Sequence, residues 1–231
     1  MFEGEAGRRL PEHGPPPSAA DGSGRELQIL TTEHWSLLSS RSLGYSEAMS
    51  RASMFIAALT GSIVALALVA QATDFGEGFR AFGLVLLPVV FFLGVVTVLR
   101  LGQINYEDAI WVQGLNRLRH AYLERAPGLA PYFVTSKHDD YSGILVSTLA
   151  RPNLNMPLQA FIALPGIVAV LDSVVAGAIT GIATLSLGTA WCLALAVVTF
   201  ALALTGFILV GVQRVASNRR RVMVRFPDDA A

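Results

Sequence analysis

Long uncharged apolar blocks constrain this chain more than any other feature. Between residues 152 and 213 the only charged residue is Asp172, and an earlier block, 52–73, carries no charge. A helix needs about 20 mostly apolar residues to cross roughly 30 Å of hydrocarbon at 1.5 Å per residue. Charged residues make up only 15% of the chain, against about 25% in a typical soluble protein. These blocks predict an integral membrane protein.

The apolar blocks divide into four candidate spans. The first two, at about 52–73 and 81–100, are separated by the short segment 74–79, which forces an antiparallel hairpin. The block 152–213 is too long for a single crossing of the bilayer. Its Ser, Gly and Thr residues cluster at 185–189, where we expect a turn between a third and a fourth span.

The distribution of arginines predicts how the spans are oriented. Basic residues gather before the first span, between the second and third, and after the fourth. Arg80 is the only basic residue between the first span and the start of the second, and the turn at 185–189 holds no charge. Cationic residues favour the cytoplasmic side of a membrane. We therefore expect four crossings, with both termini in the cytoplasm.

The basic cluster after the fourth span is expected to contact the lipid bilayer. Arginines at that position attract anionic lipid headgroups. The cluster comprises Arg214, Arg219, Arg220 and Arg221. A nucleic-acid or protein patch is the alternative, but orientation in the membrane and lipid contact explain the cluster, so we expect no nucleic-acid partner.

Two cytoplasmic segments are predicted to prolong the first two spans as helices. Segment 31–53 lacks proline, and apolar residues recur along it at Trp35, Leu38, Tyr45 and Met49. Segment 104–126 places five large apolar residues on one helix face, and Pro127 stops it. Those five residues are Ile104, Trp111, Leu115, Leu118 and Tyr122. Together the two extensions should pack as a stalk.

The predicted fold is therefore all-α: a four-span transmembrane helix bundle with cytoplasmic helical extensions of the first two spans. Residues 1–27 are too polar and too rich in proline to bury, and we expect a disordered cytoplasmic tail. The remaining units are a hairpin with its stalk at 28–126, an irregular cytoplasmic linker at 127–158, a second hairpin at 159–213 and a basic tail at 214–231. Within the linker, the apolar piece 143–149 should lie at the interface or dock under the bundle.

Asp172 is the most informative single residue for function. A carboxylate at the middle of a span costs about 2.5–3.5 kcal/mol on insertion scales. One interpretation is an ion or proton site that faces the bundle interior or an oligomeric axis, with Thr180 on a similar face two turns away. The other is a hydrogen-bonded aspartate that ties neighbouring helices together.

The third span also carries small residues at every fourth position. They are Ala169, Ser173, Gly177 and Gly181. Such a stripe allows helix backbones to approach closely in lipid. It predicts a packing face, either against the fourth span or at a homo-oligomer interface.

The sequence offers little for catalysis or metal binding. No nucleotide-binding, metalloprotease or hydrolase motif is present, and Cys192 is the only cysteine. His138, Asp139 and Asp140, with His120 upstream, have suitable side chains for a metal, but adjacent ligands on a loop give poor geometry. We interpret that cluster as a polar turn, and we expect no enzyme activity and no cofactor.

Two stretches carry a resemblance to known membrane proteins. The entry into the first span, RSLGYSEAMSRASMFIAAL, and the segment NRLRHAYLERAPGLAPYFV resemble uncharacterised multi-pass membrane proteins of GC-rich bacteria. The layout of residues 30–126 is also similar to the two-span SLATT-type membrane effectors, from which the two further spans depart. The resemblance implies a bacterial cytoplasmic (inner) membrane location, and the SLATT-type layout implies a pore-type effector.

Two hypotheses about function follow. The first is a membrane-anchored structural or interaction protein, with the stalk and tails contacting cytoplasmic partners. The second is an oligomeric ion channel or small transporter that uses Asp172. The surroundings of Asp172 separate them, because a packed side chain indicates structure, whereas several copies around a water-filled axis indicate permeation.

Overall fold

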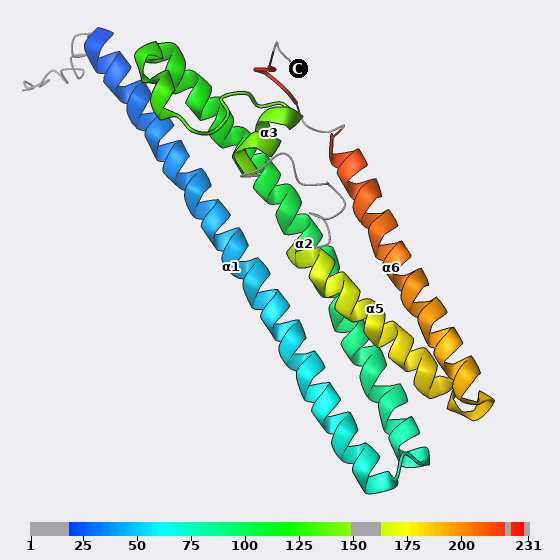
Figure 1. The fold of residues 1–231 in the computed structure, drawn as a ribbon. Helices are drawn as coiled ribbons and strands as arrows, with labels where there is room; N and C mark the ends of the chain where they lie inside the picture. Colours follow the sequence, from blue (N-terminus) through cyan, green and yellow to red (C-terminus); the bar gives the residue numbers. More distant parts are fainter. Residues whose placement is uncertain (1–18, 149–162, 220–222, 229–231) are drawn as a thin grey trace, which may run out of the picture.

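The structure is a computed structural model that describes residues 19–148, 163–219 and 223–228 (Figure 1). Over these residues it is helical, without strands, and four of its helices are long and apolar enough to cross a membrane. The predicted all-α bundle is therefore confirmed, and the chain is a membrane protein by the length and composition of its helices.

Helices α1 (Ala19–Thr73) and α2 (Glu77–Arg125) form one long antiparallel hairpin. At 1.5 Å per residue the 55 residues of α1 measure about 83 Å and the 49 residues of α2 about 74 Å, more than twice the thickness of a hydrocarbon core. Their apolar halves can therefore cross a membrane while the other halves extend beyond it, as the sequence predicted. Asp74 and Phe75 adopt φ of 48° and 57°, which makes the connecting turn tight.

The prediction of a disordered segment 1–27 is wrong for its last part, because α1 begins at Ala19. Partners on α2 stabilise this additional helix, and no local sequence pattern indicates them. Arg125 forms an ion pair with Glu26 at 2.8 Å, and the Tyr122 hydroxyl donates to the carbonyl of Leu30 at 3.0 Å. Residues 1–18 lie outside the described part of the chain.

The segment predicted as an irregular linker, 127–158, also contains helix. A 3₁₀ helix, η1 (Pro127–Tyr132), follows α2, and a short helix, α3 (Tyr141–Thr148), packs on α2. Gly143 and Ile144 of α3 are buried. Over its described residues, the apolar piece 143–149 thus packs on α2 of the stalk.

The second hairpin comprises α5 (Leu164–Ala183), the 3₁₀ turn η2 (Leu185–Leu187) and α6 (Thr189–Arg219). Gly188, with φ of 96°, reverses the chain before α6 begins. Helix α5 lies between α2 and α6, whereas α6 packs mainly on α5 and lies at the edge of the bundle (Figure 1).

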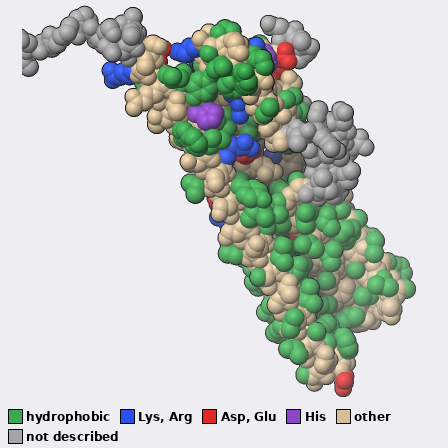
Figure 2. Space-filling model, turned by 60° about the vertical axis from the view of Figure 1, so that its left-hand side comes forward, with side chains coloured by type: hydrophobic (Ala, Val, Ile, Leu, Met, Phe, Trp, Pro, Cys, Tyr) green, Lys and Arg blue, Asp and Glu red, His purple; other side chains and the backbone are tan. Residues whose placement is uncertain are grey.

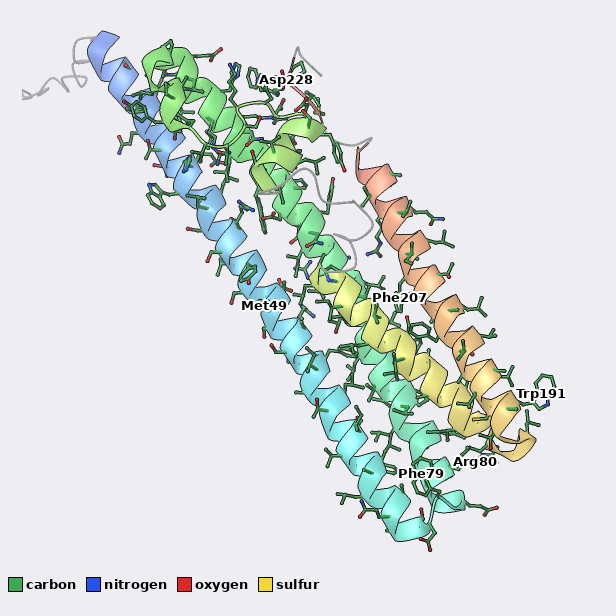
Figure 3. The ribbon with its side chains drawn as sticks, viewed as in Figure 1. Met49, Phe79, Arg80, Trp191, Phe207 and Asp228 are labelled. Atoms are coloured by element: carbon green, nitrogen blue, oxygen red, sulfur yellow. The ribbon has the colours of Figure 1, made fainter. Side chains whose placement is uncertain are left out.

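The hydrophobic core lies where α1, α2 and α5 meet. Its buried members are Ala52, Phe55, Leu87, Val90, Leu101, Val168 and Val175. At the end of the bundle away from the stalk, Arg80 Nη2 donates to the carbonyl of Ala183 at 2.6 Å. Arg80 thereby ties the start of α2 to the last turn of α5, near the exposed Trp191 (Figure 3).

The molecular surface divides into two zones along its length. On the face shown in Figure 2, hydrophobic side chains cover the half that contains the hairpin ends, and charged side chains gather on the stalk half. This division matches a protein with one half in lipid and the other in water.

Candidate functional site

Asp172 occupies a fully buried position on α5, within the apolar half of the bundle. Val168 and Val175, on the same helix, belong to the hydrophobic core. Neither carboxyl oxygen has a hydrogen-bond partner among the residues that the structure describes. The hydrogen bonds of an aspartate that ties neighbouring helices together are therefore absent among these residues. The hydroxyl groups of Ser62 and Thr97 donate within their own helices.

A glycine on α2 creates the space for Asp172. A Cβ atom added to Gly94 would lie 2.8 Å from Asp172 Oδ2, and nearer still to Oδ1 and Cγ. Real Cβ atoms essentially never approach another heavy atom that closely. The carboxyl group therefore packs directly on the backbone of α2.

Thr180 does not join Asp172 in a common site. Its hydroxyl donates to the carbonyl of Ala176 at 3.3 Å, within α5 itself. Eight residues along a helix separate the two side chains by about 12 Å. The two side chains therefore do not contact each other, and the ion or proton site predicted from them stays a prediction.

The small-residue stripe of α5 is buried, and its glycines face α6 in the same chain. A Cβ on Gly177 would lie 2.9 Å from the carbonyl oxygen of Ala196, and one on Gly181 would contact Ala196 and Cys192. Cys192 also donates its thiol to the Gly181 carbonyl at 3.1 Å. Of the two predicted uses, the structure shows packing on α6. Ala169 and Ser173 are buried on the same helix.

Arg214 contacts the protein itself. Its Nη1 donates to the carbonyl of Leu99 on α2 at 3.1 Å. Arg219 ends α6, and its side chain, with Arg220 and Arg221, lies outside the described residues. Lipid contact by this cluster stays a prediction.

Ion pairs join α1 to α2 along the stalk. Arg41 Nε lies 2.6 Å from Asp108 Oδ1, and Glu47 accepts from Arg51 and Arg100 at 2.7 and 2.9 Å. Hydrogen bonds from Arg100 and then Arg51 lower the pKa of Glu47 to about 2. Glu47 thus stays ionised down to strongly acidic pH and fixes the register of the two helices beside the membrane.

Of the four apolar residues predicted on segment 31–53, three are exposed and Leu38 is half-buried. Trp35, Tyr45 and Met49 leave 65%, 68% and 44% of their surface exposed. Gly44 and Leu37 make the contacts instead, facing Trp111 and Gly114 of α2. The stalk therefore presents a lengthwise apolar stripe, which we define as the exposed Trp35, Tyr45 and Met49 together with the half-buried Leu38.

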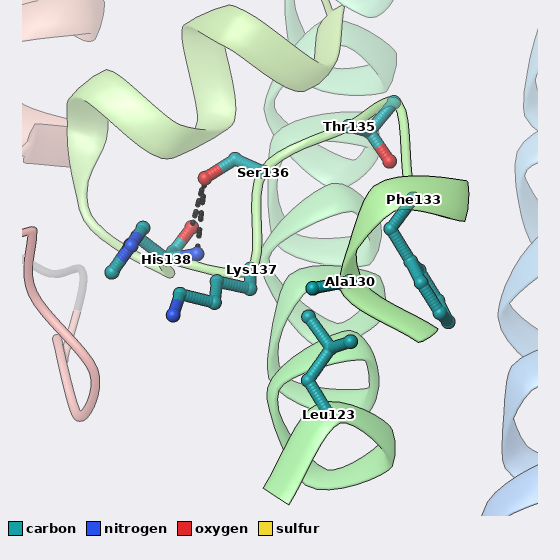
Figure 4. A pocket seen from close by; sticks show the side chains of 7 residues that line it. All are labelled: Leu123, Ala130, Phe133, Thr135, Ser136, Lys137 and His138. Carbon is teal, nitrogen blue, oxygen red and sulfur yellow. Dashed lines mark hydrogen bonds between the residues drawn. The ribbon is translucent and has the colours of Figure 1, made fainter. Parts of the chain in front are cut away.

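The stalk also has a shallow hollow of about 290 Å³ beside its tip (Figure 4). Leu123, Ala130 and Phe133 line one side, and the loop 135–138 lines the other. The hollow is open and joins apolar side chains to Lys137, without an assembled set of catalytic groups. Within the described ranges, no three His, Cys, Asp or Glu side chains come together to hold a metal ion.

Comparisons with models of known protein families, with curated proteins and with solved structures found no match for this chain.

Proposed function

We propose that the protein is a membrane-anchored structural or interaction protein of a bacterial cytoplasmic membrane, with its stalk and both termini in the cytoplasm. The observation that carries this proposal is the apolar stripe of α1. Trp35 and Tyr45 each expose about two thirds of their surface on a helix that extends beyond the predicted bilayer. Large exposed apolar patches on a water-facing surface mark sites of association.

The stalk is built to hold this stripe in a fixed position. Arg41 and Glu47 pair α1 with Asp108 and Arg100 of α2, and Arg125 closes the far end by pairing with Glu26. A stripe on a braced helix binds a partner without the cost of ordering a flexible segment. Aromatic side chains such as Trp and Tyr are the residues that most often dominate binding energy.

Photo-crosslinking in living cells tests the proposal. A photoreactive residue at position 45 should give a discrete cross-linked product, and the same probe at the buried position 115 should give none. Trp35→Glu should remove the product at position 45 without changing the amount of protein in the membrane. Equal products from positions 45 and 115, or a product that survives Trp35→Glu, would count against the stripe as an interaction site.

The second candidate is an oligomeric ion pathway that uses Asp172. Its support is one observation, a fully buried carboxyl group without a hydrogen-bond partner in the described chain. The close packing on Gly94 argues against it, since the fully buried carboxyl group faces the backbone of α2. Ion flux into liposomes containing the purified protein separates the two proposals. Our proposal predicts no flux, whereas flux that disappears in Asp172→Asn would support the pathway.

A further inference from the structure

The end of the chain returns to the stalk after α6. The extended segment Met223–Asp228 lies beside the cytoplasmic part of α2 and the loop before α3 (Figures 1 and 3). It has no helix or strand, and Met223 and Val224 remain 74% and 45% exposed. So short a segment with so little apolar burial keeps its place through specific polar contacts.

Asp139 lies at the centre of these contacts. Its side chain is fully buried, and it accepts hydrogen bonds from the backbone amides of Arg225 at 3.0 Å and Phe226 at 2.7 Å. The Asp139 amide in turn donates to the carbonyl of Phe226 at 3.2 Å. The loop thus pairs with the segment much as a neighbouring strand would, with a carboxylate in place of one carbonyl.

Two side chains of α2 complete the polar recognition. Arg117 donates its Nε to Asp139 Oδ2 at 2.7 Å and its Nη2 to the carbonyl of Met223. Gln113 Nε2 bridges the carbonyls of Asp139 and Met223, at 2.9 and 3.1 Å. Both residues therefore bind the loop and the terminal segment at once, so neither half of the site is complete without the other.

Two histidines bind the last part of the segment. His120 of α2 stacks on the ring of Phe226, with ring centroids 4.0 Å apart and planes 21° apart. His138 Nδ1 lies 3.1 Å from the carbonyl oxygen of Pro227. The site consequently recognises an extended backbone and one aromatic side chain, which is the chemistry of a peptide-binding site.

We propose that this surface of the stalk is a peptide-recognition site whose ligand is the chain's own segment Met223–Asp228, and that the bound segment latches α6 to the stalk. Helix α6 needs such a restraint, since its most apolar stretch buries no residue and it packs mainly on α5. Release of the segment would free the end of α6 and open the site around Asp139.

Binding of a peptide in trans tests the recognition site. A fluorescent peptide of residues 222–231 is titrated, by anisotropy, into purified protein in lipid nanodiscs. Protein truncated after residue 221 should bind it, and the full chain should bind at least about tenfold more weakly because its own segment fills the site. Equal binding to both proteins, or no binding to the truncated one at millimolar peptide, would overturn the proposal.

Peptide variants keep this test independent of protein folding. Phe226→Ala in the peptide removes the ring that stacks on His120 and should weaken binding by about tenfold. Val224→Ala is the matched control, because Val224 is exposed and should be neutral. On the protein, Asp139→Asn should weaken binding by at least about tenfold, while Asp108→Asn, outside the site, should not. Equal effects of Phe226→Ala and Val224→Ala would contradict the assigned contacts.

Hydrogen exchange in the full chain tests the latch itself. Phe226→Ala should speed amide exchange in the last turns of α6, at residues 205–219, and leave α5 unchanged. Faster exchange in both helices, or in neither, would show that the terminal segment does not restrain α6.

Discussion

The contact between Gly94 and Asp172 gives the sharpest quantitative prediction. In Gly94→Ala, the new methyl group would overlap three atoms of a carboxyl group that is itself fully buried. Overpacking of this kind costs about 1–3 kcal/mol, and we expect the upper end because the blocked group lies between helix backbones. The assay is reversible unfolding in mixed micelles, followed by circular dichroism.

A double-mutant cycle isolates this contact. Asp172→Ala removes the three overlapping atoms, so Gly94→Ala in that background should lower the free energy of unfolding by close to nothing. Any small remaining loss should be offset by the higher helix propensity of alanine, a gain of about 0.5–1 kcal/mol. The coupling energy between the two positions should reach about 3 kcal/mol. Gly61→Ala is the control, because a Cβ there would meet nothing within 4 Å. Additive effects of the two substitutions would refute the packing of Asp172 on α2.

Three further predictions concern the stalk. Gly44→Ala places a Cβ 2.7 Å from the Trp111 ring and should lower the free energy of unfolding by about 1–3 kcal/mol. Chemical denaturation measures this free energy, and an unchanged value would contradict the close approach of α1 and α2. Glu47→Gln should lower the melting temperature at low salt, because it removes the ion pair with Arg100. A wild-type melting temperature that does not change with salt concentration would argue against this ion pair. Burial alone would raise the pKa of Asp139, but hydrogen bonds from Phe226, Arg117 and Arg225 outweigh it and hold the pKa below its ordinary value of 3.8. Ionised Asp139 should therefore support peptide binding fully at pH values above 3.8. Binding should weaken as the pH falls through the lower pKa that Asp139 has in the folded protein. Other charged or titratable residues also face this site, namely Arg117, His120, His138, Asp140, Arg225 and Asp228. If Asp139 is the cause, the loss of peptide binding at acidic pH must therefore disappear in Asp139→Asn.

Much of the fold could be predicted because bilayer spans are encoded locally. The uncharged blocks and the Ser, Gly and Thr turn at 185–189 are visible in the sequence, and so is the apolar face of 104–126 that packs in the stalk. The small-residue stripe indicated a close helix contact, and it left open whether the fourth span or a second copy of the chain would be the neighbour. These features depend on spacing along one helix, which the sequence shows directly.

Features that depend on distant residues could not be predicted in this way. The polar turn at His138–Asp140 gave no sign that it binds residues 223–228, because those contacts join segments more than 80 residues apart. The lack of hydrogen-bond partners for Asp172 likewise could not be predicted, because it depends on another helix. Gly94 of α2 leaves the space that the carboxyl group fills. The apolar stripe of α1 was visible as a pattern, but whether it faces α2 or open space is decided by Gly44 and Leu37 on the contacting side.

Labelling of single cysteines in intact cells tests the four-crossing arrangement most directly. In a Cys192→Ser background, cysteines replace the exposed Glu77 and Leu187 at the two hairpin ends, and the exposed Glu26 of the stalk serves as the opposite-side reference. We predict that an impermeant maleimide labels positions 77 and 187 in intact cells, and position 26 only after lysis. Protection of either hairpin end until lysis, or labelling of position 26 in intact cells, would contradict it.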